Sequence, residues 1–114
     1  MKILITGVAG FIGYHLAKEL IGKSNKVIGI DNINSYYDKK LKLDRLKQLE
    51  LFSKQKNYSW EFKKCDIADD DAIKNIFQEI KPNIIIDLAA QAGVRYSLEN
   101  PKAYISSNIV GFCN

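Results

Sequence analysis

A glycine-rich segment near the amino terminus constrains the fold of this chain more than any other feature. Residues 6–13 read Thr-Gly-Val-Ala-Gly-Phe-Ile-Gly. An apolar run at residues 2–5 precedes the segment, and an amphipathic stretch at residues 11–21 overlaps its end. A strand, a glycine-rich turn and a helix in this order are typical of a dinucleotide-binding site. The pattern therefore predicts a strand–turn–helix unit whose turn faces a pyrophosphate.

Each of the three glycines has a separate role in such a turn. Gly7 can leave the strand through backbone angles that a Cβ atom forbids. Gly10 has no side chain to hold a pyrophosphate away from the backbone, and Gly13 lets the helix lie close to the sheet. The start of the helix then offers unpaired N–H groups and a positive dipole end to the phosphates.

An acidic residue after the second strand distinguishes a dinucleotide site from an ordinary tight turn. Residues 26–30 predict that strand, and Asp31 follows at the expected spacing of about 20 positions. A carboxylate there can accept hydrogen bonds from both hydroxyls of an adenosine ribose, and it repels a 2′-phosphate. No arginine follows immediately, so the sequence favours NAD over NADP. A helix cap or turn residue is the alternative for Asp31, because Asp-Asn is common in turns.

Length and composition bound the number of domains. The chain has 114 residues, of which 46% are hydrophobic and 26% charged, as in an ordinary globular protein. That length allows one small domain with a core. A doubly wound dinucleotide domain has about six strands, and we find four candidates. We therefore expect residues 1–114 to be the N-terminal part of an NAD-binding domain in a longer protein, with a substrate domain elsewhere.

Basic residues are concentrated in the middle of the chain. The net charge is +4, and much of the excess lies between residues 39 and 64. This stretch is either a nucleic-acid patch or the solvated face of a helix. We favour the solvated face and predict no nucleic-acid partner, because no aromatic platform for bases is interleaved with the lysines. The opposite, apolar side of that helix is predicted to consist of Leu41, Leu46, Leu49 and Phe52.

The cysteine and histidine content excludes several kinds of site. Cys65, Cys113 and one histidine are too few for a structural zinc site, and we predict no metal. No apolar run approaches the ~20 residues of a membrane span, and no signal-peptide pattern opens the chain. We expect a cytoplasmic protein without a membrane partner.

Further along the chain, predicted helices and strands alternate. We expect helices over residues 39–53 and 72–80 and from residue 101 onward, strands over 58–62 and 84–88, and loops over 32–38 and 89–97. Three aspartates at residues 69–71 predict the N-terminal cap of the helix over 72–80. The continuous apolar run at 84–88 predicts a central strand that is covered on both faces. The alternation predicts an α/β fold, a Rossmann-type doubly wound parallel sheet that is incomplete, with about four strands and four helices.

Ligands of such sheets bind outside the carboxyl ends of the strands, where several informative residues follow the predicted strands. Asp66 can accept from an adenine amino group, or it is a turn residue before a helix. The small residues at 89–93 leave space for a large ligand. Arg95 can pair with a phosphate there, or it is a surface residue.

Several stretches of this chain resemble a known family. Residues 6–13 with Asp31 and Asn32 resemble the extended short-chain dehydrogenase/reductases, and among them the nucleotide-sugar epimerases. Three stretches resemble the UDP-glucuronate 4-epimerase branch: residues 31–46, residues 88–97, and Asn100-Pro101 followed by Tyr104, Asn108 and Gly111. The family commonly has His before Leu-Ala-Ala, whereas this chain has Asp87. An acid buried there would need a partner.

The resemblance implies NAD as cofactor and a set of residues around it. Backbone N–H groups at 11–12 would bind the pyrophosphate, residues 31–36 the adenosine ribose, residues 66–67 adenine, and residues 89–91 the nicotinamide side. A helix asparagine at 108 would touch the cofactor or order the site. The implied cofactor-binding residues are Gly7, Gly10, Phe11, Ile12, Gly13, Asp31, Asn32, Ile33, Asn34, Ser35, Tyr36, Asp66, Ile67, Ala89, Ala90, Gln91, Arg95 and Asn108.

The resemblance also implies an activity, the C4 epimerisation of a UDP-hexose or UDP-hexuronate through a transient 4-keto sugar. In the family, a tyrosine base in a Tyr-x-x-x-Lys motif on a later helix moves the proton. Tyr36 and Lys40 have this spacing but lie in the ribose loop, so we predict no catalytic residue in this chain and no activity of the chain alone. A sugar-nucleotide dehydratase or reductase of the same family and a non-catalytic NAD-binding module are the alternatives. We also expect a homodimer or other self-association through exposed apolar surface.

Overall fold

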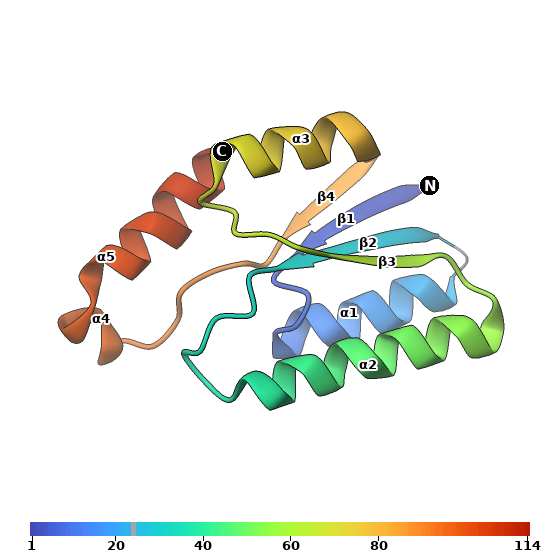
Figure 1. The fold of residues 1–114 in the computed structure, drawn as a ribbon, viewed down its shortest axis with the longest axis horizontal. Coiled ribbons are helices and arrows are strands. Elements are labelled where there is room, and N and C mark those ends of the chain that lie inside the picture. Colours follow the sequence, from blue (N-terminus) through green and yellow to red (C-terminus); the bar gives the residue numbers. More distant parts are fainter. Residues whose placement is uncertain (24) are drawn as a thin grey trace.

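Four parallel strands form one sheet in the part of the chain that the structure describes, residues 1–23 and 25–114 of a computed structural model (Figure 1). β1 (Lys2–Thr6) lies between β2 (Lys26–Asp31) and β4 (Ile84–Asp87), and β3 (Trp60–Lys64) pairs with β2. The resulting order, β3-β2-β1-β4, is that of the first four strands of a Rossmann sheet. The predicted fold class is confirmed.

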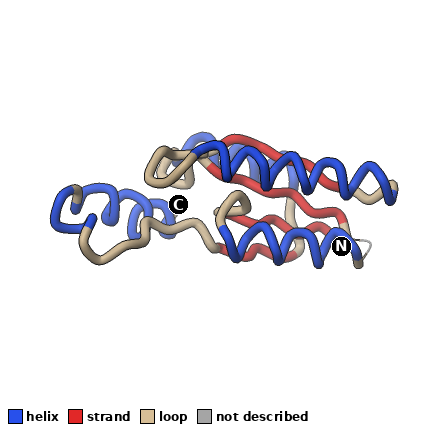
Figure 2. Tube along the Cα trace, turned by 90° about the horizontal axis from the view of Figure 1, so that it is seen from below, coloured by secondary structure: helices blue, strands red, loops and turns tan. Residues whose placement is uncertain are grey.

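Helices cover both faces of this sheet: in Figure 1 they lie above and below the strands, and Figure 2 looks from below onto the lower helices. α1 (Phe11–Gly22) and α2 (Lys39–Lys56) pack on one face, and α3 (Asp70–Ile80) packs on the other. Successive strand residues point to opposite faces, so a continuous apolar run supplies both layers of the core. The first layer includes Ile3, Ile5, Val27, Ala17, Ile21 and Leu49, and the second includes Leu4, Ile28, Ile30, Ile73, Ile76 and Ile80.

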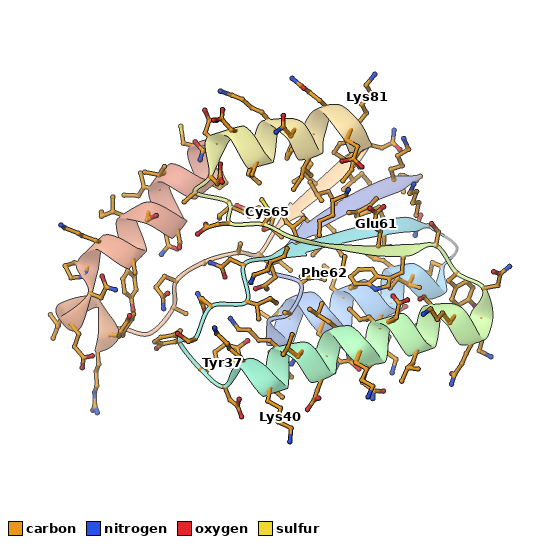
Figure 3. All side chains as sticks on the ribbon, in the orientation of Figure 1. Tyr37, Lys40, Glu61, Phe62, Cys65 and Lys81 are labelled. Carbon is orange, nitrogen blue, oxygen red and sulfur yellow. The ribbon has the colours of Figure 1, made fainter. Side chains whose placement is uncertain are left out.

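β3 and α2 differ slightly from the predicted bounds. β3 begins two residues later than expected, at Trp60, because α2 extends to Lys56 and ends at Asn57 in the left-handed conformation (φ 55°). Phe62 packs with the α1 and α2 layer (Figure 3), whereas Lys63 pairs with Glu79 of α3 at 2.8 Å. The aromatic–polar alternation of this segment is thus that of a strand with two different faces.

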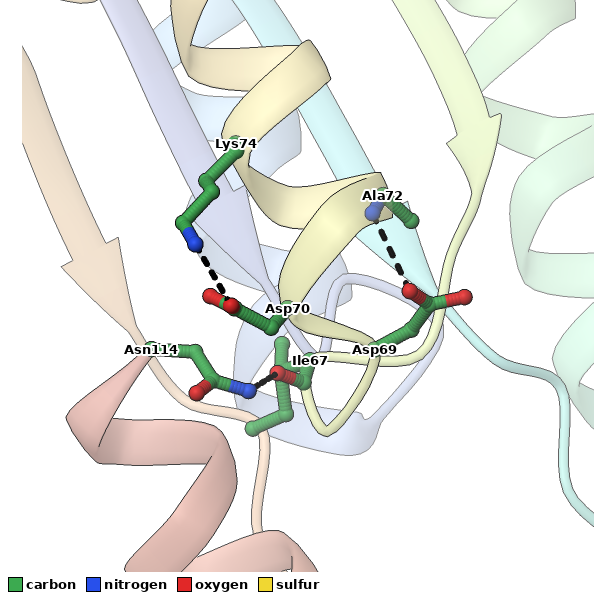
Figure 4. A network of polar contacts seen from close by, with 6 residues as sticks. All are labelled: Ile67, Asp69, Asp70, Ala72, Lys74 and Asn114. Carbon is green, nitrogen blue, oxygen red and sulfur yellow. Dashed lines mark hydrogen bonds and ion pairs between the residues drawn. The ribbon is translucent and has the colours of Figure 1, made fainter.

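The start of α3 follows from its sequence. Asp69 accepts a hydrogen bond from the backbone N–H of Ala72 at 3.1 Å and caps the helix (Figure 4). Asp70 pairs with Lys74 one turn later at 2.6 Å. Acidic residues in the first turn also favour the positive end of the helix dipole. The predicted Asp-rich cap is confirmed.

The carboxyl-terminal segment contains more helix than predicted. α4 (Tyr96–Glu99) forms one turn at the end of the predicted loop, and α5 (Pro101–Tyr104) continues directly into a π-helical stretch, η1 (Ile105–Gly111). Asn100 separates the two helices and caps α5 by accepting from the N–H of Ala103 at 3.3 Å. None of the helices in the described residues is long and apolar enough to cross a membrane.

β4 lies at the edge of the sheet that the described residues form, so the prediction that it is a central strand covered on both faces is not met within residues 1–114. Among the described residues, only β1 pairs with it. Ile84 and Ile85 are accordingly 40% and 48% exposed. An apolar run reports what a strand is able to bury, and the number of its neighbours depends on the rest of the sheet.

Candidate functional site

A cavity of about 550 Å³ lies at the carboxyl ends of the strands, where doubly wound sheets bind their ligands. The glycine turn after β1, the loops after β2 and β4, the turn after β3 and the start of α2 form its walls. Its volume is in the range of small-molecule sites. The predicted residues that line it are Gly7, Gly10, Phe11, Asp31, Asn32, Asn34, Tyr36, Asp66, Ile67, Ala89, Ala90 and Gln91. The predicted residues that do not line it are Ile12, Gly13, Ile33, Ser35, Arg95 and Asn108.

The glycine turn needs its glycines for close backbone contacts. Gly7 has φ +65°, and a Cβ atom there would lie 2.7 Å from the carbonyl oxygen of Leu88. A Cβ atom at Gly13 would lie 2.9 Å from Cα of Val8, so this glycine allows α1 to approach the turn itself. Gly10 precedes α1, and no side chain caps the helix. The first turn of α1 therefore presents its N–H groups toward the turn.

Asp31 joins the glycine turn to the loop after β2. The residue is 9% exposed, and its Oδ2 accepts from the N–H of Ala9 at 3.0 Å while Oδ1 accepts from the N–H of Ile33 at 2.9 Å. Asp31 therefore also acts as a turn residue, which was the alternative considered for it. Each carboxylate oxygen has a second lone pair, so Asp31 retains acceptors for a ligand on the cavity wall.

The loop after β2 is built from asparagine side chains that accept from nearby backbone. Asn32 Oδ1 accepts from the N–H of Asn34 at 3.1 Å. Asn34 Oδ1 in turn accepts from Lys42 Nζ at 2.8 Å. Such Asx turns give a polar loop a defined shape, and this loop presents Asn32, Asn34 and Tyr36 to the cavity.

Lys42 of α2 lies on the cavity wall and is only 5% exposed, so the prediction of a solvated basic face is wrong at this position. Its ammonium group lies 4.6 Å from the centroid of the Tyr37 ring, in a cation–π contact. Burial lowers the pKa of Lys42, and the negative charge of Asp31 opposes that shift. Neighbouring lysines of α2, Lys39 and Lys40, are exposed as predicted.

Arg45 lies one turn further along α2 and also lines the cavity. Its Nη1 donates to the carbonyl oxygen of Ala9 at 3.0 Å and to the hydroxyl of Tyr37 at 3.1 Å. Residues three apart on a helix share a face, so Lys42 and Arg45 together form one cationic wall. Leu41, predicted on the apolar side, is instead 45% exposed.

The turn after β3 closes the opposite side of the cavity. Asp66 lines the cavity and accepts from the N–H of Ala68 at 2.9 Å, so it does serve as a turn residue before α3. Cys65 precedes it, at the end of β3 (Figure 3), and burial raises the pKa of its thiol. Ile67 is buried, and its carbonyl oxygen accepts from Asn114 Nδ2 at 3.0 Å (Figure 4).

Thr6 is the hydrogen-bond partner of Asp87. The hydroxyl of Thr6 donates to a carboxylate oxygen of Asp87, and it accepts from the backbone N–H groups of Leu88 and Ala89 at 2.9 Å each. Asp87 itself is exposed rather than buried. One hydroxyl thus ties the end of β1 to the start of the loop that follows β4.

The loop after β4 is held by side chains of the last helices. Asn108 Oδ1 accepts from the N–H of Gln91 at 2.8 Å, and Tyr104 donates its hydroxyl to the carbonyl oxygen of Ala92 at 3.0 Å. Asn108 therefore acts on the shape of this loop and does not itself line the cavity. Arg95 is exposed and lies just before α4, which fits the surface interpretation.

Several lining residues were not predicted, among them Lys42, Arg45 and Cys65. Tyr14 and Lys18 have the Tyr-x-x-x-Lys spacing and were also overlooked, although the spacing is readable in the sequence. They lie on α1 and do not line the cavity; Lys18 instead lies 5.6 Å from the centroid of the Phe52 ring.

No group of three or more metal-ligating side chains comes together among the described residues.

The chain is similar in sequence to known proteins over nearly its whole length. The family model described as GDP-mannose 4,6 dehydratase matches residues 4–114. The protein CapI of Staphylococcus aureus is 53% identical over the whole chain, and a probable UDP-glucuronate 4-epimerase of Rhizobium meliloti is 46% identical over the whole chain. The chain spans 32% of the length of each.

Solved structures agree with the fold. The crystal structure of UDP-glucose-4-epimerase from Stenotrophomonas maltophila, with bound NAD and formylated UDP-arabinopyranose, superimposes with a TM-score of 0.79. The two chains are 27% identical, and the similarity covers 99% of this chain and 31% of that one.

Proposed function

The chain belongs to the GDP-mannose 4,6-dehydratase family, and on that premise we propose that its cavity binds NAD for a nucleotide-sugar 4-epimerase. The observation that carries the proposal is the position of Asp31. Its carboxylate lies on the cavity wall and is bonded to the glycine turn through Ala9. A ribose bound at Asp31 would therefore lie next to a pyrophosphate bound at the glycine turn, which is how the two groups are joined in the adenosine diphosphate part of NAD.

The residues present fit this cofactor. Gly7 and Gly10 leave the turn without side chains on the cavity side, and the N-terminus of α1 carries no capping side chain to compete with a phosphate. Asp31, Asn32 and Asn34 offer carboxylate and amide groups at the ribose end. Asp66 would meet adenine from the turn after β3.

NAD, when bound, would supply the chemistry of hydride transfer at C4 of the sugar. The residues of this chain bind and orient the cofactor. The open strand end at Ala89, Ala90 and Gln91 would receive the nicotinamide side, and Asn108 would position that loop through Gln91. We propose that Arg95 and the backbone at Phe11 and Ile12 contact phosphate groups.

The substrate and the catalytic groups are part of the same proposal. We propose a UDP-hexose or UDP-hexuronate as substrate, because the Rhizobium meliloti relative is named as a probable UDP-glucuronate 4-epimerase. The chain spans about a third of such relatives, so residues 1–114 would form the N-terminal part of an NAD-binding domain. We place the catalytic tyrosine and lysine outside this part and expect no turnover of UDP-sugars by the chain alone.

Two other functions remain as alternatives. The description of the matching family model favours a sugar-nucleotide dehydratase or a related reductase, which would use the same cofactor site. A non-catalytic NAD-binding module would also retain that site. A tyrosine–lysine pair near the nicotinamide in the longer protein distinguishes either enzyme from the module.

We also propose a cellular compartment and a partner for the protein. Two free cysteines suit the reducing cytoplasm. Exposed apolar side chains on η1 and the adjoining segment, including Ile105, Ile109 and Phe112, suit a homodimer or another apolar partner.

Titration of NAD into the purified protein by calorimetry tests the proposal. Asp31→Ala removes both ribose acceptors and should weaken NAD binding at least tenfold. Asp44→Ala removes an exposed acid of α2 that does not line the cavity and should leave the affinity unchanged. Equal affinities of the wild type and Asp31→Ala would contradict the ribose assignment, and absent binding by the wild type would contradict the function.

A further inference from the structure

Three tyrosines from separate segments pack together beside the cavity. Tyr36 belongs to the loop after β2, Tyr96 begins α4, and Tyr104 ends α5. The ring centroids of Tyr36 and Tyr96 lie 4.9 Å apart, and those of Tyr96 and Tyr104 lie 6.3 Å apart. Both distances are typical of attractive aromatic pairs. The rings therefore join the loop after β2 to the short helices that follow the loop after β4.

Gly93 allows Tyr36 to come this close to the loop after β4. This glycine has φ +100°, and a Cβ atom there would overlap the hydroxyl oxygen of Tyr36 and lie 3.6 Å from that of Tyr104. Tyr104 also donates its hydroxyl to the carbonyl oxygens of Ala92 and Gly93. Burial raises the pKa of Tyr104, and the neighbouring phenols raise it further, so its hydroxyl remains a donor at neutral pH. Two phenol groups thus hold the same glycine.

Of the three tyrosines, only Tyr36 lines the cavity. A nucleotide at the ribose end can therefore cover the ring of Tyr36 without reaching Tyr96 or Tyr104. Because Tyr36 is 43% exposed, its ring keeps conformational freedom that such a ligand would remove. The ring has the ligand on one side and the loop after β4 with α4 on the other.

α4 depends on contacts of this kind. It is a single turn of four residues that stands apart from the sheet (Figure 1). None of its residues is buried, and Leu98 is 87% exposed. A helix of this length is not stable by itself, so side-chain contacts with neighbouring segments must hold it. The packing of Tyr96 on Tyr36 is such a contact, and it leads directly to the cavity wall.

We propose that Tyr36 is a positioning residue: a nucleotide that covers its ring fixes the loop after β4 and α4 through Gly93 and Tyr96. This inference rests on the proposed function, because it requires the adenosine part of NAD to bind at the loop after β2. Gln91 lies in the fixed loop, and Arg95 directly precedes α4. Binding of the adenosine half thus prepares the residues that meet the nicotinamide side and a phosphate. Such coupling needs no change of shape, because a ligand that orders one segment lowers the cost of ordering its neighbour.

Hydrogen exchange in and just after α4 tests the proposal, because no residue from 96 to 100 lines the cavity. The N–H groups of Ser97, Leu98 and Asn100 donate to backbone carbonyls within residues 94–100, at 3.2, 3.1 and 2.9 Å. Their exchange therefore reports local opening of this segment. The probe is 5′-AMP, which contains the adenosine part of NAD and no nicotinamide. Saturating 5′-AMP should slow the exchange of these amides about fivefold or more in the wild type.

Two variants interrupt the contact, one from each side. Tyr36→Leu removes the ring on the cavity wall, and Tyr96→Leu removes the ring outside it. Both should lose the slowing at a concentration of 5′-AMP that calorimetry shows to be saturating. Tyr36→Phe keeps the ring and should retain the slowing. Leu98→Ala, which changes an exposed residue of the same helix, is the control and should also retain it.

Three results would overturn the inference alone. The first is exchange in α4 that does not change when the wild type binds 5′-AMP. The second is slowing that persists in Tyr96→Leu, and the third is slowing that Leu98→Ala abolishes as well. A wild-type protein that binds neither NAD nor 5′-AMP overturns the proposed function and this inference with it.

Discussion

The side-chain amide of Asn108 holds the backbone of Gln91 through both of its polar groups: Oδ1 accepts from the N–H at 2.8 Å, and Nδ2 donates to the carbonyl oxygen at 3.0 Å. A side-chain amide can accept and donate at the same time in this way, whereas an ionised carboxylate can only accept. The contact joins η1 to the loop after β4 and determines where that loop stands at the cavity.

Asn108→Asp should therefore be more harmful than its small change in shape suggests. The acid retains the acceptor for the N–H of Gln91 but sets a second oxygen against the carbonyl oxygen. We expect a loss of about 1 kcal/mol in the free energy of unfolding and faster hydrogen exchange at Gln91. Ser106→Ala, at an exposed position on the same π-helical stretch, is the control and should change neither quantity.

Thr6→Val should destabilise the protein although it keeps the shape of the side chain. Valine leaves the N–H groups of Leu88 and Ala89 without their acceptor and Asp87 without its donor. We expect urea unfolding to show a loss of about 2 kcal/mol. Thr6→Ser retains the hydroxyl and should lose less than half as much. Equal losses in the two variants would mean that packing of the methyl group, and not the hydroxyl, matters at this position.

Gly13→Ala should disturb the glycine turn from within α1. The added methyl group would overlap the carbonyl oxygen of Gly7 and lie 2.9 Å from Cα of Val8, so the helix must shift away. We expect a loss of about 1–3 kcal/mol in stability together with weaker NAD binding. Gly22→Ala on the same helix meets only an ordinary contact, 3.8 Å from the Phe52 ring. Because Gly22 is the last residue of α1, this variant should cost no stability, and a comparable loss there would argue against the steric explanation.

Alkylation should distinguish the two cysteines and locate the ligand. Cys113 is exposed and Cys65 is buried on the cavity wall. Because burial raises the pKa of the Cys65 thiol, less of it is thiolate at neutral pH than in a free cysteine. Iodoacetamide should modify Cys113 first, and the rate at Cys65 should rise with pH toward its raised pKa. Mass spectrometry of the peptides measures both rates.

NAD should slow the alkylation of Cys65 further and leave that of Cys113 unchanged. Protection of both cysteines, or of neither, would contradict the placement of adenine beside the turn after β3. The exposed thiol serves as the internal control, because it reports any direct effect of the nucleotide on the reagent.

Features encoded in short stretches were predicted correctly. The glycine turn, the turn that Asp31 forms at the end of β2 and the cap of α3 each depend on neighbouring residues, and the structure has all three where they were expected. Patterns of this kind reflect backbone geometry and hydrogen bonds between residues a few positions apart.

Features that depend on distant contacts were not predicted. The partner of Asp87 is Thr6, which is 81 residues away. Lys42 is buried and Arg45 half-buried because of contacts with Tyr37 and, for Arg45, with Ala9 of the glycine turn. The basic residues of α2 lie on several faces, so periodicity alone does not distinguish these two. The edge position of β4 likewise follows from the strand order and not from its own apolar sequence.

The bond from Thr6 to the loop after β4 also has a kinetic meaning, because it joins residues 82 positions apart. Pairing of β1 with β4 closes the longest loop in the sheet, and such closure is slow compared with formation of local helices and turns. The glycine turn and the strand end at Ala89 stand opposite each other only after this step. Nucleotide binding during refolding would therefore report when β1 and β4 pair.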